Sequence, residues 1–159
     1  MLKYLVIAAT LGAMGCAHAD DLKTKEEVSA AAKQGVTFIS SDDLRARQDA
    51  NPDLILLDVR TEQEYARGHI PGAKWMSRGV AEFKLAETVR DPDAEIILYC
   101  RTGSRAALVK KALDEIGYRN VQVHAGFETW TSAGGLLESD VGTFKLVETE
   151  PGEAASATQ

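Results

Sequence analysis

The sequence predicts an α/β domain with a mainly parallel, five-stranded sheet flanked by helices. Short apolar or β-branched runs alternate along the chain with segments of helical composition, which is the pattern of βαβ units. Residues 54–57 and 95–99 contain continuous apolar runs, as strands buried on both faces of a parallel sheet do. The chain has 159 residues, 45% hydrophobic and 26% charged, and this suits one globular domain.

Residues 1–19 have the composition of an export signal. Lys3 is basic, residues 5–15 are apolar, and Ala17-His18-Ala19 forms a small-x-small cleavage site. The apolar run is too short to span a bilayer, and no second one follows it. We therefore expect a signal peptide cleaved after Ala19, a periplasmic or secreted protein, and no transmembrane span. An uncleaved N-terminal anchor is the alternative.

Loss of this leader changes the charge and the cysteine content. Residues 1–19 hold one lysine and no acidic residue, so 17 basic and 24 acidic residues remain and nucleic acid is disfavoured as a partner. A lipoprotein acylated at Cys16 is also disfavoured, because Met14 is bulky for that motif. Cleavage leaves Cys100 as the lone cysteine, which is either buried and inert or kept for its reactivity.

The mature chain starts with a lead-in segment, residues 20–35. Its acidic start and alanine-rich continuation predict a helix that Gly35 ends. The β-branched and aromatic run 36–39 predicts a short strand, and the serines and aspartates after it are N-cap candidates for a helix over 42–48. The apolar run 54–57 is the first strand expected to be buried on both faces.

The middle of the chain is predicted to be a helix, a turn, an edge strand and a second helix. Thr61 and Glu64 form a capping pattern that opens a short helix over 61–67. The glycines and proline of residues 68–73 make a turn-rich connection into an edge strand at 74–76. Residues 81–89 then have helical composition.

The last third repeats the strand and helix alternation. A buried strand over 95–99 is followed by an amphipathic helix over 106–116, and residues 120–123 are predicted to be the last strand. A helix containing Trp130 follows. Residues 139–159 are polar, and we expect them to be a disordered tail.

The candidate functional site is the segment between the strand at 95–99 and the helix at 106–116. The first N–H groups of a helix lack intrahelical partners, and a small loop lets several of them face one anion. A cysteine there, beside arginines, is expected to ionise more readily than an ordinary thiol. The segment reads Cys100-Arg101-Thr102-Gly103-Ser104-Arg105.

Three blocks of the sequence form one pattern. The first runs from Leu56 to Arg60, continues with Glu64-Tyr65 and ends with the Gly-His-Ile-Pro-Gly-Ala turn of residues 68–73. The second is the cysteine loop with the Tyr before it and two Ala after it, and the third is Gly126 with Trp130. In this order the blocks resemble the single-domain rhodaneses, a family of thiosulfate or sulfane-sulfur transferases. The resemblance implies a rhodanese-like three-layer fold over about residues 36–138.

The resemblance also implies a ping-pong mechanism. Cys100 would attack the outer sulfur of an anionic donor such as thiosulfate and become a persulfide, from which cyanide or a thiol takes the sulfur. Loop N–H groups would stabilise the anions, Arg101 would help to hold the donor, and Arg105 would add positive potential or brace the loop. No cofactor and no metal are expected, and the oligomeric state is left open.

Other interpretations remain beside this one. The domain could be a persulfide carrier or a partner-docking module without turnover. A cysteine phosphatase or an arsenate reductase is less favoured, because those phosphatases use Cys-x5-Arg whereas Cys100 and Arg105 are spaced as Cys-x4-Arg. Asp58 and Arg60 are interpreted as a structural ion pair.

Histidines and large aromatic side chains are interpreted as structural. His69 lies in a turn motif and is expected to form hydrogen bonds there, and the ligand spacing of a metal site is absent. His124 follows the last predicted strand and is assigned to a turn, with a position in the crevice as the alternative. Trp75, Phe127 and Trp130 are interpreted as core anchors rather than as a substrate platform.

Overall fold

The computed structural model describes residues 22–146 and contains the predicted parallel sheet. Its five strands are all parallel and lie in the order β1-β5-β4-β2-β3. They are β1 (Phe38–Ile39), β2 (Ile55–Asp58), β3 (Lys74–Trp75), β4 (Ile96–Tyr99) and β5 (Val121–His124). The fold class read from the sequence is confirmed.

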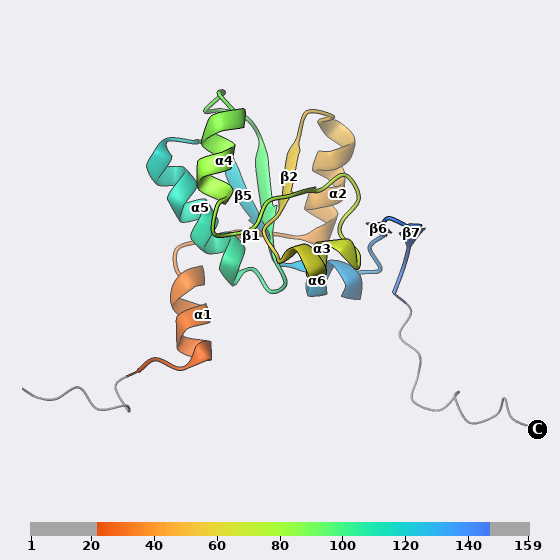
Figure 1. The fold of residues 1–159 in the computed structure, drawn as a ribbon, viewed down its shortest axis with the longest axis horizontal. Coiled ribbons are helices and arrows are strands. Elements are labelled where there is room, and N and C mark those ends of the chain that lie inside the picture. Colours follow the sequence, from red (N-terminus) through yellow and green to blue (C-terminus); the bar gives the residue numbers. More distant parts are fainter. Residues whose placement is uncertain (1–21, 147–159) are drawn as a thin grey trace, which may run out of the picture.

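Helices cover both faces of the sheet and make three layers. In Figure 1, α4 and α5 lie on one side of the strands and α2 on the other, with α1 extending from the α5 side. The helices are α1 (Lys25–Lys33), α2 (Ser41–Ala50), α3 (Glu62–Ala66), α4 (Ala81–Thr88), α5 (Ser104–Ile116) and α6 (Phe127–Ser132). Capping boxes at Thr24, Ser40 and Thr61 open α1, α2 and α3, and the one at Thr61 uses Glu64, as the sequence predicts.

The central strand β4 divides its side chains between two cores. Ile96 and Leu98 point into the core under α4 and α5, whereas Ile97 and Tyr99 point into the core under α2 and α6. This alternation follows from the two-residue period of a strand. All four residues are fully buried, which explains why this segment has no polar positions.

Strands β2 and β4 end at the same edge of the sheet. Asp58 pairs in register with Tyr99, and the Val59 N–H donates to the Tyr99 carbonyl at 3.0 Å. The segments after both strands therefore emerge next to each other at the carboxyl edge, where ligands bind in parallel sheets.

A β-hairpin corrects the prediction for the C-terminal end. Strands β6 (Leu137–Ser139) and β7 (Gly142–Phe144) pair antiparallel, so 120–123 is not the last strand and the predicted tail at 139–159 is wrong for residues 139–146. The segment folds despite its polar composition because two apolar side chains are buried. Leu137 lies opposite Phe144, and both pack on the core beneath α2 and α6. Reciprocal backbone hydrogen bonds of 2.9 and 2.8 Å between His69 and Glu138 fix the hairpin to the turn before β3.

Two predicted segments lie outside the described residues: the signal peptide at 1–19 and the end of the tail at 147–159. Within residues 22–146, no helix is long and apolar enough to cross a membrane.

Candidate active site

Cys100 directly follows β4, and its side chain is buried, with 1% of the residue exposed. Helix α5 begins at Ser104, two residues earlier than predicted, because Gly103 adopts a left-handed conformation with φ +88° and serves as the N-cap. No side chain caps this helix. Three residues therefore span the gap between the thiol and the helix, and the turn is tight.

The backbone of this loop presents a set of free donors. Within the described part of the chain, the N–H groups of residues 101–106 have no hydrogen-bond acceptor. Unpaired N–H groups at an uncapped helix start form a site for an anion, and the helix dipole adds positive potential there. The loop is thus suited to hold a negatively charged group beside Cys100.

Glu64 braces Arg105 from the neighbouring helix α3. The two terminal guanidinium nitrogens of Arg105, Nη1 and Nη2, donate to the two carboxylate oxygens of Glu64, each at 2.8 Å. These bonds are the largest cause of a Glu64 pKa lowered to about 2, and they raise the pKa of Arg105, to which the charge of Cys100 also contributes. The Glu64 carboxylate is protonated, and the ion pair lost, only when the pH falls below 4.5 toward 2. Arg105 therefore stays fixed near Cys100 at neutral pH.

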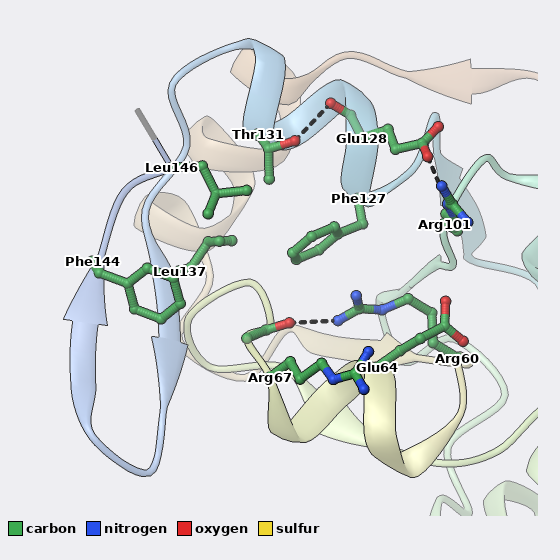
Figure 2. Close-up of a pocket in the computed structure, with 11 residues that line it drawn as sticks. Arg60, Glu64, Arg67, Arg101, Phe127, Glu128, Thr131, Leu137, Phe144 and Leu146 are labelled. Carbon is green, nitrogen blue, oxygen red and sulfur yellow. Dashed lines mark hydrogen bonds and ion pairs between the residues drawn. The ribbon is translucent and has the colours of Figure 1, made fainter. Parts of the chain in front are cut away.

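The start of α6 holds the other side of the loop. The N–H of Phe127 donates to the Cys100 carbonyl at 2.8 Å, and the N–H of Glu128 donates to the Arg101 carbonyl at 3.2 Å. The Glu128 carboxylate also accepts from Arg101 Nε at 2.6 Å, but this pair is solvent-exposed (Figure 2). Arg101 therefore lies at the solvent-exposed rim of the loop, paired with Glu128.

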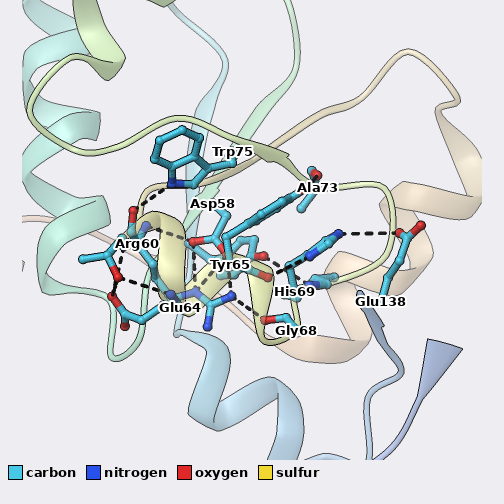
Figure 3. Close-up of polar contacts among 12 residues, drawn as sticks. Asp58, Arg60, Glu64, Tyr65, Gly68, His69, Ala73, Trp75 and Glu138 are labelled. Carbon is cyan, nitrogen blue, oxygen red and sulfur yellow. Dashed lines mark hydrogen bonds and ion pairs between the residues drawn. The ribbon is translucent and has the colours of Figure 1, made fainter. Parts of the chain in front are cut away.

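Asp58 and Arg60 form the predicted structural ion pair behind the loop. Arg60 donates to Asp58 through Nε, at 2.8 and 3.0 Å, and through Nη2 at 2.6 Å, and Nη2 also donates to the Gly68 carbonyl at 2.8 Å (Figure 3). The guanidinium lies 4.0 Å over the Phe127 ring. Asp58 is fully buried and Arg60 is 4% exposed, so this pair is shielded from solvent.

Comparison with known proteins identifies the domain that carries this loop. Residues 40–133 match the Rhodanese-like domain family. The chain belongs to the rhodanese family. Sulfur transfer is thus the general activity supported for its domain.

Two relatives and one solved structure illustrate the match. The rhodanese domain is 39% identical over 92 residues to YtwF of Bacillus subtilis, covering 58% of this chain and 87% of that one. It is 31% identical over 100 residues to a sulfurtransferase of Allochromatium vinosum, covering 62% and 92%. A thiosulfate sulfurtransferase from Pseudomonas aeruginosa shares the fold, with a TM-score of 0.64 at 24% identity over 70% of this chain and 23% of that chain.

Gly126 lets the rhodanese loop approach the start of α6. Its φ is +131°, and a Cβ at this position would lie 2.4 Å from the carbonyl oxygen of Arg101. Only the absence of a side chain permits this contact. The sequence marks Gly126 as part of the family pattern, and the structure supplies the physical reason.

Gly126→Ala is expected to destabilise the domain by about 1–3 kcal/mol and to lower sulfur-transfer activity at least tenfold, because the loop backbone must shift to admit the methyl group. Urea unfolding and steady-state rates test this. Gly117→Ala is a matched control, since Gly117 has φ +113° and nothing within 4 Å of its added Cβ. Equal effects of the two substitutions would mean that backbone strain, rather than the loop contact, explains the loss.

His124 supports Gly126 from behind. Its ring is fully buried, and Nδ1 accepts from the Gly126 N–H at 3.2 Å. Nε2 therefore carries the proton and donates to Ser41 Oγ at 3.0 Å. Burial, and to a lesser degree the charge of Arg45, lowers the His124 pKa to about 4. His124 is thus a neutral structural residue, but it is the last residue of strand β5, so its assignment to a turn is wrong.

The stability of the domain is expected to fall as the pH drops from 6.5 to 4. In this window His124 is protonated in the unfolded chain, at its ordinary pKa of 6.5, but stays neutral in the folded chain. The resulting loss of free energy of unfolding approaches roughly 3 kcal/mol. Denaturant titrations at several pH values measure it. In His124→Asn, whose amide oxygen can replace Nδ1, most of this dependence should disappear, and an unchanged slope would contradict the assignment.

Two contacts at the site could not be predicted from the residues alone. Ser104 Oγ lies 2.6 Å from Ser29 Oγ, so the lead-in helix α1 reaches the loop. Glu64 reads as a capping residue only, although it also braces Arg105. Thr102 is exposed at the loop's tip, and Phe127 is half-buried and packs against the core beneath α2 and α6. The family pattern contains Glu64 and is the signal that could have found it.

The remaining aromatic and histidine predictions are mostly confirmed. Trp130 is 3% exposed and Trp75 is half-buried, its Nε1 donating to the Arg60 carbonyl at 3.1 Å. His69 stacks on Tyr65 and forms a 3.1 Å hydrogen bond with the Tyr65 carbonyl. Among residues 22–146, no group of three or more His, Cys, Asp or Glu side chains could hold a metal.

Proposed function

We propose that this protein is an exported sulfurtransferase that moves sulfane sulfur from thiosulfate to a thiophilic acceptor through a persulfide on Cys100. The observation that carries the proposal is the position of Cys100, at the start of a loop whose N–H groups are unpaired and whose arginine is fixed by Glu64. Residues 1–19 would be removed on export. The intact mass of protein recovered from a periplasmic extract reports that cleavage.

The first half-reaction transfers sulfur to the protein. The Cys100 thiolate attacks the outer sulfur of thiosulfate, a new S–S bond forms, and the original S–S bond breaks. Its electron pair leaves with sulfite, and Cys100 holds the persulfide Cys–S–S⁻. The N–H groups of residues 101–106 would stabilise the negative charge on the outer sulfur, as fixed dipoles do for developing anions.

The arginines have different proposed roles in this step. Arg101 is exposed at the rim, where its charge would attract the sulfite end of the donor. Arg105 is half-buried and held in one position by two bonds to Glu64, so it would stabilise the thiolate without moving. Gly103 and Ser104 shape the loop, and Thr102 lies at its exposed tip.

The second half-reaction returns the thiolate. Cyanide attacks the outer sulfur of the persulfide, the S–S bond breaks, and thiocyanate leaves while Cys100 regains its electron pair. A thiol acceptor would take the same sulfur as a persulfide of its own. Because the two halves share no ternary complex, the kinetics are expected to be ping-pong.

The test separates the two halves. With thiosulfate alone, the protein should release one sulfite per Cys100, and added cyanide should then yield thiocyanate with parallel lines in double-reciprocal plots. Stoichiometric sulfite without turnover would instead support a persulfide carrier. Absence of sulfite release, together with hydrolysis of an aryl phosphate or reduction of arsenate, would overturn the proposal in favour of a phosphatase or an arsenate reductase.

A further inference from the structure

Helix α1 lies outside the family match and still reaches the cysteine loop. The match to the rhodanese family begins at residue 40, whereas α1 spans Lys25–Lys33. In Figure 1, α1 extends from the side of the sheet that α5 covers. Ser29 Oγ on α1 lies 2.6 Å from Ser104 Oγ, in a partly buried contact. Helix α1 therefore contributes a contact to the loop that the family pattern does not contain.

Ser104 is the first residue of α5, but its hydroxyl does not cap that helix. Serine or threonine hydroxyls open α1, α2 and α3 by accepting from a backbone N–H of the first turn. Helix α5 has no side-chain cap, although a serine stands at its start. Within residues 22–146, the contact with Ser29 is the one hydrogen bond of the Ser104 side chain. The Ser104 hydroxyl is thus directed to α1 and accepts from no backbone N–H of the loop.

A serine hydroxyl that lacks such an outside partner accepts hydrogen bonds from the backbone near it. A common donor is the N–H two residues further along the chain. For Ser104 this donor is the N–H of Ala106, which is one of the unpaired groups of residues 101–106. That bond would remove a donor from the anion site beside Cys100. The contact with Ser29 therefore determines whether all the loop N–H groups stay available.

Two further contacts hold the segment that carries Ser29 against α5 and the loop. Lys111 Nζ on α5 donates to the Ala31 carbonyl on α1 at 3.3 Å. The Phe38 ring, from β1, packs so closely on the loop that a Cβ at Gly103 would lie 2.7 Å from it. The approach of Ser29 to the loop is therefore fixed by α5 and β1 as well as by its own hydrogen bond.

We propose that Ser29 is a positioning residue of the sulfur-transfer site, which holds the Ser104 hydroxyl and thereby leaves the Ala106 N–H free for the anion beside Cys100. The inference rests on the proposed function, in which the loop N–H groups stabilise the charge on the outer sulfur. Ser29 acts through Ser104 and not on the reacting atoms. Removal of the Ser104 hydroxyl should therefore repair the loss of Ser29.

Single-turnover release of sulfite from thiosulfate tests the inference. Ser29→Ala should lower the maximal rate about tenfold and change the half-saturating thiosulfate concentration less than about threefold, because an N–H donor is lost while Arg101 is unaltered. The double variant Ser29→Ala/Ser104→Ala should be at least about threefold faster than Ser29→Ala, since no hydroxyl is left to occupy the Ala106 N–H. A wild-type rate in Ser29→Ala, or no gain in the double variant, would overturn the proposal.

Lys111→Met is the matched control for the docking of α1. It removes the hydrogen bond to the Ala31 carbonyl and leaves the Ser29 hydroxyl in place. Its rate of sulfite release should equal that of the wild-type protein. A loss as large as that of Ser29→Ala would assign the effect to the docking of α1 and contradict a specific role of Ser29.

Amide hydrogen exchange keeps the two proposals distinguishable. In Ser29→Ala the Ala106 N–H should exchange at least about threefold more slowly than in the wild-type protein, because it is then hydrogen-bonded, and the double variant should restore the wild-type rate. This pattern without any sulfite release would support the role of Ser29 and contradict the proposed function. Normal sulfite release by every variant, with unchanged exchange at Ala106, would contradict the role of Ser29 and leave the proposed function intact.

Discussion

Replacement of Cys100 by serine is expected to abolish thiocyanate formation from thiosulfate and cyanide. A serine hydroxyl in this loop does not ionise near neutral pH, and it cannot form the persulfide that links the two half-reactions. The unpaired N–H groups of residues 101–106 remain in the variant, so the loss of activity reports the role of the sulfur atom separately from that of the surrounding anion site. Rates of thiocyanate formation with saturating donor and acceptor measure the effect.

The control for this variant is its fold. Cys100 is almost fully buried, so the added hydroxyl costs stability on the order of 1–3 kcal/mol if it finds no partner. Urea unfolding followed by tryptophan fluorescence establishes that the inactive variant is folded. If folded Cys100→Ser keeps even a tenth of the wild-type rate, sulfur does not pass through this residue.

Asp58→Asn is expected to lower the free energy of unfolding by about 3–5 kcal/mol, the largest stability effect predicted for this domain. The substitution preserves side-chain size but removes the charge that pairs with Arg60. The Arg60 guanidinium would then be buried with only the Gly68 carbonyl and a neutral amide as acceptors. Since Arg60 packs on the Phe127 ring, and the Phe127 N–H holds the Cys100 carbonyl, activity should fall as well.

An exposed pair provides the comparison for Asp58. Arg119 and Asp93 form an ion pair in which both side chains are more than half exposed, so Asp93→Asn should lower the free energy of unfolding far less than Asp58→Asn does. The two variants remove the same charge from a carboxylate paired with an arginine and differ mainly in burial. Similar losses in urea unfolding would show that burial of the Asp58 pair does not determine its contribution.

The central strands could be predicted because burial on both faces leaves few polar positions in a strand. Ile96 and Ile97 point to opposite cores, so each is apolar, and the run predicts a central strand without any long-range information. The loop is predictable for a related reason. Cys100, the glycine three positions later and Arg105 are local in sequence, and together they specify a tight strand-to-helix turn.

Contacts between distant segments could not be predicted in this way. Ser29 and Ser104 are far apart in the chain, and neither residue type marks the hydrogen bond between them. The hairpin pairs only three residues on each strand. Leu137 and Phe144, the apolar side chains that pack it on the core, have mostly polar neighbours in the sequence, so the local composition predicts no strand there.

The persulfide on Cys100 is tested most directly by the intact mass of the protein after incubation with thiosulfate and removal of excess donor. The mass is expected to increase by one sulfur atom, the increment should map to the peptide that contains Cys100, and cyanide should remove it with release of one thiocyanate. An unchanged mass while sulfite and thiocyanate are formed, or an increment on any other residue, would contradict transfer through Cys100.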